Sequence, residues 1–140
     1  YISSLTLLVQ KEFAQKCIAK PGSKDYTSLS VFLQFYFSIH FSFKVSRNCF
    51  YPVPDVDSAV IHLVPRSPLP YTVDQHFFNI IRAGFWGRRK TFTRCLKDNP
   101  YYKYSAKQLN DIPFFQLNPK IRAESCNIED FYSIYKHLHT

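Results

Sequence analysis

One stretch of sequence decides the fold. Residues 39–64 read IHFSFKVSRNCFYPVPDVDSAVIHLV. Apolar and polar residues alternate over 39–45, which puts Ile39, Phe41, Phe43 and Val45 on one face, and this period of two is typical of a half-covered strand. Residues 58–64 form a second apolar run, joined to the first by a proline-bearing loop. The pattern predicts two antiparallel strands that end a sheet.

The residues before this stretch continue an α/β pattern. Residues 5–9 (LTLLV) are a short apolar run rich in β-formers, which predicts a buried strand of a parallel sheet. Residues 11–20 and 28–37 are predicted helices, and Pro21-Gly22 ends the first of them. Strand, helix, helix, strand, loop, strand is the order expected for the back half of an α/β sheet.

The residues after the stretch have a helical pattern. Prolines 65, 68 and 70 mark a boundary. Thr72 with Gln75, and Ser105 with Gln108, are predicted capping boxes, and a last helix is predicted from near Asn127. Between the two capping boxes, glycines 84 and 87 are predicted to separate two helices. These helices share one apolar stripe, which consists of Phe78, Ile81, Phe85, Phe92 and Leu96. We therefore predict two domains, 1–66 and 72–140, the second all-helical.

Composition bounds the class of protein. The 140 residues are 46% hydrophobic, enough for a core, and carry a net charge of +8, which favours an anionic partner. Charge alone does not separate nucleic acid from a membrane surface. No apolar run reaches the roughly 18 residues of a membrane span. The four widely spaced cysteines predict free buried thiols in an intracellular protein. The chain lacks methionine, so its first residue is expected to be a cut edge.

Few residues have the spacing that cofactors, metals or nucleophiles require. The three glycines (22, 84 and 87) form no glycine-rich loop after a strand, so no cofactor-binding site is predicted in this chain. The cysteines and histidines lack metal-ligand spacing, and no metal site is predicted.

The loop of residues 50–58 is the most specific local feature. Pro52 and Pro54 fix two φ angles and remove two donors, which predicts a rigid loop that holds Phe50 in one place. A fixed ring is suited to stacking on a flipped-out base. The alternative is a stiff connection between strands with Phe50 packed in the core.

A basic cluster follows the boundary. From residue 71 to 104 the cations far outnumber Asp74 and Asp98, and they would contact phosphates with an affinity that falls with salt. The alternative is a solvated helix face. The predicted RNA-binding residues are Arg82, Arg88, Arg89, Lys90, Arg94 and Lys97, with Lys103 nearby.

Five motifs in order resemble the KsgA-type small-subunit ribosomal RNA adenine dimethyltransferases. They are Leu8-Val9-Gln10-Lys11-Glu12, residues 20–26 (KPGSKDY) with Leu29-Ser30-Val31, Phe50-x-Pro52-x-Pro54-x-Val56-Asp57-Ser58-Ala59-Val60, Phe85 with Arg88-Arg89-Lys90-Thr91, and Arg122-Ala123-Glu124 with residues 128–131 (IEDF). The resemblance implies a Rossmann-like methyltransferase domain followed by a small helical domain that binds RNA. Trp86-Gly87 stands where the family tends to have small polar residues.

The resemblance also implies an activity and a site. S-adenosylmethionine would donate two methyl groups to N6 of adenine, and its site is expected upstream of residue 1. Tyr1 resembles the tyrosine that stacks on the base, Phe50 the ring on its other face, and Pro52, Pro54, Asp57 and Ser58 the target loop. In the family a helix separates Ile2-Ser3-Ser4 from the strand that Leu5 begins.

The expected protein is a cytoplasmic monomer that acts on small-subunit ribosomal RNA, without a membrane partner. The fragment alone is expected to be inactive. Two other functions stay open: an Erm-type methyltransferase of large-subunit RNA, and a non-catalytic RNA-binding, ribosome-assembly or transcription factor of the same fold.

Overall fold

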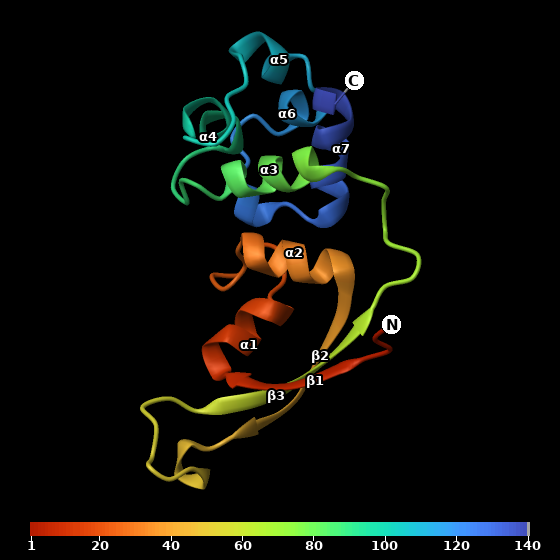
Figure 1. Cartoon of the computed structure of the whole chain (residues 1–140). Helices are drawn as coiled ribbons and strands as arrows, with labels where there is room; N and C mark the ends of the chain where they lie inside the picture. Colours follow the sequence, from red (N-terminus) through yellow and green to blue (C-terminus); the bar gives the residue numbers. More distant parts are fainter. Residues whose placement is uncertain (140) are drawn as a thin grey trace.

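The computed structural model describes residues 1–139, and its first half is built on a three-stranded sheet (Figure 1). The strands are β1 (Leu5–Gln10), β2 (Phe37–Val45) and β3 (Ser58–Pro65), in the order β1-β3-β2, and both pairings are antiparallel. The predicted antiparallel pair, β2 and β3, is confirmed. The parallel, buried environment predicted for residues 5–9 is wrong within the described residues, since β1 pairs with β3 and most of its residues are exposed.

A β-bulge in β2 changes which side chains face the core. Phe41 pairs with Ile61, but Phe43 pairs with Val60, so Ser42 is the extra residue. The bulge inverts the alternation that follows, because side chains along a strand point to opposite faces in turn. Phe43, predicted on the covered face, is 57% exposed, and Lys44 lies opposite the buried Ala59 instead.

Two helices cover one face of the sheet. They are α1 (Lys11–Ile18) and α2 (Ser28–Tyr36), and α1 packs Ala14 and Cys17 on the buried side of β3. Thr27 and Ser30 form a capping box at the start of α2. Both predicted helices are confirmed, the first ending two residues early.

The second half is helical, as predicted. The two glycines lie at the end of α3 (Gln75–Gly84) and before α4 (Phe92–Asp98), and a Cβ added to Gly84 would clash with the Phe92 ring, so the two helices approach closely there. The capping box of Ser105 and Gln108 is confirmed. The cap of α3 is not Thr72 but Asp74, whose Oδ1 accepts from the His76 amide at 2.9 Å. The helices are α3 (Gln75–Gly84), α4 (Phe92–Asp98), α5 (Ala106–Asn110), α6 (Pro113–Leu117) and α7 (Ile128–His139).

The main hydrophobic core crosses the predicted domain boundary. Phe35 of α2 is 1% exposed, and its ring lies 5.3 Å from that of Phe77 on α3. Tyr26 donates its hydroxyl to the carbonyl of Cys126 at 2.7 Å. Figure 1 shows α2 lying directly against the helical half. The division into 1–66 and 72–140 stays a prediction, and one core stabilises both sides of it.

Three of the four thiols are buried. Cys17, Cys95 and Cys126 are in the interior, and burial raises the pKa of Cys126 to about 12, so it stays protonated. Cys49 is exposed, and the prediction of burial is wrong for it. Among residues 1–139 no helix combines the length and apolar character needed to cross a membrane.

Candidate functional site

The target loop follows the carboxyl end of β2 and lies beside that of β1. β1 and β2 run in the same direction because each is antiparallel to β3. Phe50 lines a pocket of about 440 Å³, one wall of which is Leu8, Val9 and Gln10 at the end of β1. The pocket is completed by Tyr51, Pro52, Pro54 and Ser58.

Asp57 fixes both ends of the loop. Its Oδ1 accepts from the backbone N–H of Arg47 at 2.9 Å, and its Oδ2 lies 3.5 Å from Nζ of Lys44. The Arg47 guanidinium returns across the loop to donate to the Asp55 carbonyl at 2.9 Å. Ser46 caps the short helical turn η1 (Arg47–Cys49) by accepting from the amide of Asn48. These hydrogen bonds restrain the loop in addition to the two prolines from which its rigidity was predicted.

The charge state of Asp57 controls this anchor. The hydrogen bond from the Arg47 amide has the largest effect and lowers the pKa of Asp57; desolvation by burial opposes it, and the Lys44 and Arg47 charges lower the pKa further. Because the folded protein lowers this pKa, the anchor is fully formed above the ordinary aspartate pKa and is lost as pH falls through the folded value.

Replacing Asp57 by alanine is expected to speed hydrogen exchange at the Arg47 amide at neutral pH, since that amide loses its acceptor. The difference from the wild type should shrink only as the pH falls through the folded pKa of Asp57, below the ordinary aspartate value, because wild-type Asp57 then also becomes protonated. Exchange followed by NMR or mass spectrometry measures both effects.

Asp55 provides the matched control. It lies in the same loop, and within residues 1–139 its carboxylate makes no hydrogen bond or ion pair. Asp55→Ala should leave exchange at Arg47 unchanged. Equal exchange in the two variants would show that the carboxylate of Asp57 does not hold the loop.

Tyr1 lies at the other end of the sheet. It lines a separate pocket with Phe37, Val64 and Pro65, where β2 begins and β3 ends, whereas Phe50 lies beside the opposite ends of these strands. Six residues of β1, with a rise of about 3.4 Å each, separate the two positions. The structure does not bring both rings to one base, and a stacking role for Tyr1 stays a prediction.

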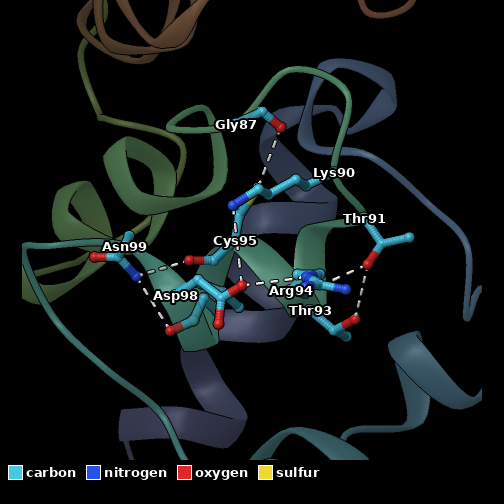
Figure 2. Close-up of polar contacts among 9 residues, drawn as sticks. Gly87, Lys90, Thr91, Thr93, Arg94, Cys95, Asp98 and Asn99 are labelled. Carbon is cyan, nitrogen blue, oxygen red and sulfur yellow. Dashed lines mark hydrogen bonds and ion pairs between the residues drawn. The ribbon is translucent and has the colours of Figure 1, made fainter.

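The predicted basic cluster lies over the turn between α3 and α4 and along α4. Figure 2 shows Asp98 between two of its cations, Lys90 at 3.9 Å and Arg94 at 3.2 Å. The Cys95 thiol donates to the carbonyl of Gly87 at 3.3 Å and closes the turn from the other side. These contacts position the cations while neutralising part of their charge.

The remaining cations differ in how much they are engaged. Arg88 donates to the Lys24 carbonyl at 2.8 Å and lies 4.0 Å from Glu124, so it joins the two halves of the chain. Arg82 lies over the Tyr101 ring at 4.6 Å. Arg89 and Lys97 make no ion pair or hydrogen bond within residues 1–139, and both are exposed. These two are the cations most available to an anion.

The sequence prediction missed the residues that hold the site together. Lys44 and Arg47 anchor Asp57, and Asp98 and Glu124 pair with the cluster. The i,i+4 spacing of Arg94 and Asp98 on one helix was a signal for the Asp98 pair. Glu124 is far from Arg88 in the sequence, and no local pattern indicates their contact.

A nucleotide-type cofactor site would need a glycine turn directly after a strand, and none of the glycines among residues 1–139 lies in such a turn. Gly22, with a φ of 88°, lies in the turn after α1, and Gly84 packs against Phe92. In the part of the chain that the structure describes, no group of three histidine, cysteine or acidic side chains is placed to hold a metal ion.

Solved structures identify the class to which this fold belongs. A dimethyladenosine transferase from Plasmodium falciparum matches 99% of this chain with a TM-score of 0.80 at 20% identity, and the chain covers 57% of it. The 23S rRNA methyltransferase ErmE matches 99% of this chain with a TM-score of 0.64 at 22% identity, and the chain covers 56% of ErmE. The fold is thus part of the Rossmann-like fold of these two proteins, with a three-stranded sheet followed by helices.

The sequence comparisons identify the family. The chain belongs to the ribosomal RNA adenine dimethylase family, whose model matches residues 1–140. It is 41% identical to a ribosomal RNA small subunit methyltransferase A from Protochlamydia amoebophila over 99% of this chain and 48% of the relative. A protein of the same name from Chlamydia muridarum is 38% identical over 96% of this chain and 48% of its own length. The chain spans about half the length of these curated relatives.

Proposed function

We propose that the complete protein is an S-adenosylmethionine-dependent methyltransferase that dimethylates adenine N6 in small-subunit ribosomal RNA. The observation that carries the proposal is the anchored loop that holds Phe50 at the carboxyl ends of β1 and β2, in a chain of this family. The cofactor would be held by residues outside this chain. The fragment alone is expected to be inactive. We further propose a cytoplasmic monomer.

The loop would contribute by positioning. Phe50 offers one ring face to a flipped-out adenine, while Pro52, Pro54 and the Asp57 anchor keep that ring from moving. Ser58, the first residue of β3, fixes the end of the loop by pairing with Gln10 and Val45. Orientation of this kind can supply a large part of a rate enhancement because the reacting atoms are held in line.

Methyl transfer by the full-length protein tests this proposal. Labelled S-adenosylmethionine should leave dimethyladenine in small-subunit particles and not in large-subunit particles. Label in the large subunit would favour the Erm-type alternative, and RNA binding without label would favour a non-catalytic factor. Identities of 36–41% to proteins named for the small subunit support the first outcome.

The basic cluster is proposed to bind RNA phosphates through its least engaged members. Replacing Arg89 and Lys97 together by alanine should weaken binding and lower the slope of log affinity against log salt by about 1.5, since each phosphate contact contributes roughly 0.7–0.9. Filter binding at several salt concentrations measures this slope.

A control of equal charge separates local contact from net charge. Lys16 of α1 and Lys107 of α5 are exposed and lie outside the cluster. Their double alanine variant should leave the slope nearly unchanged. Equal slopes for both double variants would contradict a local phosphate site and indicate a general effect of net charge.

A further inference from the structure

Trp86 is a large, apolar and substantially exposed side chain in the turn between α3 and α4, just before the three consecutive cations of the basic cluster. It lies directly after α3, is 43% exposed, and is the only tryptophan of the chain. An exposed tryptophan ring offers a large, rigid, flat face to another molecule. The residues that follow it, from Gly87 to Lys90, include three consecutive cations rather than an apolar patch.

The ring of Trp86 is held in place by a chain of contacts. Its backbone N–H donates to the Ala83 carbonyl at 3.2 Å, and Nζ of Lys90 lies 4.3 Å from the ring centroid. Lys90 is fixed in turn by its amide, which donates to the Gly87 carbonyl at 2.9 Å, and by Asp98 at 3.9 Å. Within residues 1–139 Lys90 is the only charged or aromatic group recorded against this ring.

An aromatic ring fixed among cations has the chemistry of a single-stranded nucleic acid site. Bases stack on the ring whatever their identity, because every base has a π-face, and the cations take the phosphates on either side. Arg89 and Lys97, both exposed and without ion pairs in the described residues, are the available cations. A protein partner would instead need a contiguous apolar surface around the tryptophan.

We propose that Trp86 is a stacking site for an unpaired RNA base, separate from the loop of Phe50, with the neighbouring phosphates bound by Arg89 and Lys97. This inference rests on the proposed function, since it assumes an RNA ligand. It adds a second base contact, in the helical half, to the one proposed for the target adenine. The site would favour unpaired over duplex RNA, because paired bases hide their faces in the stack.

The test is binding of an unstructured RNA of about twelve nucleotides to the full-length protein. Trp86→Ala should weaken binding about 5- to 160-fold, since a stacked base contributes roughly 1–3 kcal/mol. The salt slope should stay unchanged because no charge is removed. Trp86→Phe should recover most of the affinity. RNA should also quench a component of tryptophan fluorescence that is missing in Trp86→Phe.

Two controls separate stacking from a merely structural role. If Trp86 only held Lys90 in place, Trp86→Ala would lower the salt slope as Lys90→Ala does. The double variant would then lose no more affinity than either single variant. That result overturns the proposal. Equal loss of affinity for duplex RNA, or equal quenching by a glutamate oligopeptide, also overturns it. Methyl transfer to small-subunit particles is measured separately, so failure of the proposed function is distinguishable from failure of the stack.

Discussion

Replacing Phe50 by alanine in the full-length protein is expected to lower kcat for methyl transfer about 10- to 100-fold, while the Kd for ribosomal RNA changes by less than about threefold. The physical reason is that one stacked base is worth roughly 1–3 kcal/mol and that this contact is made only after the base leaves its helix. Most of the RNA affinity comes from phosphate contacts elsewhere. Single-turnover kinetics with small-subunit particles separates the two effects.

Val53 is the matched control for Phe50. It lies in the same loop and is 55% exposed, outside the pocket that Phe50 lines. Val53→Ala should leave kcat within about twofold of the wild type, and Phe50→Tyr should keep most of the activity because it keeps the ring. An unchanged kcat in a folded Phe50→Ala variant would remove Phe50 from the site.

Replacing Phe35 by alanine should lower the free energy of unfolding by about 3–5 kcal/mol. The side chain is 1% exposed and contacts rings on both sides of the predicted domain boundary, Tyr36 on its own helix and Phe77 and Phe78 on α3. Its loss leaves a cavity shared by both halves. Denaturant unfolding, followed by circular dichroism, measures the change.

The shape of that transition tests the shared core. If one core stabilises both halves, Phe35→Ala should shift the sheet and the helices together, without a new intermediate. Leu117→Ala is the control, since Leu117 is 83% exposed and should cost less than about 0.5 kcal/mol. Destabilisation of the helical half alone would mean that the two halves unfold independently.

Local patterns predicted most of the elements because local forces determine them. The alternation over 39–45, the glycines at 84 and 87 and the capping box of Ser105 with Gln108 all lie where the structure has the corresponding strand, break and cap. The position of the basic cluster along the chain could also be predicted, because three of its cations are consecutive in the sequence.

What the sequence did not reveal depends on distant partners. The bulge at Ser42 is set by pairing with β3, so the exposure of Phe43 has no local signal. Thr72 and Asp74 are both good cap residues, and only the folded chain selects Asp74. The cluster looked uniformly available for RNA, yet Glu124 and Asp98 engage Arg88, Lys90 and Arg94.

The segment between α1 and α2 has a consequence for the order of folding. The Gly22 amide donates to the Glu124 carbonyl at 2.7 Å, and Tyr26 reaches Cys126 across 100 positions of sequence. Contacts this distant close late, because loop-closure entropy opposes them until both partners exist. During synthesis the segment between α1 and α2 therefore remains unanchored until residues 122–127 have left the ribosome, so an enzyme proposed to modify ribosomes completes this core only after a stretch about 100 positions further along the chain has emerged from one.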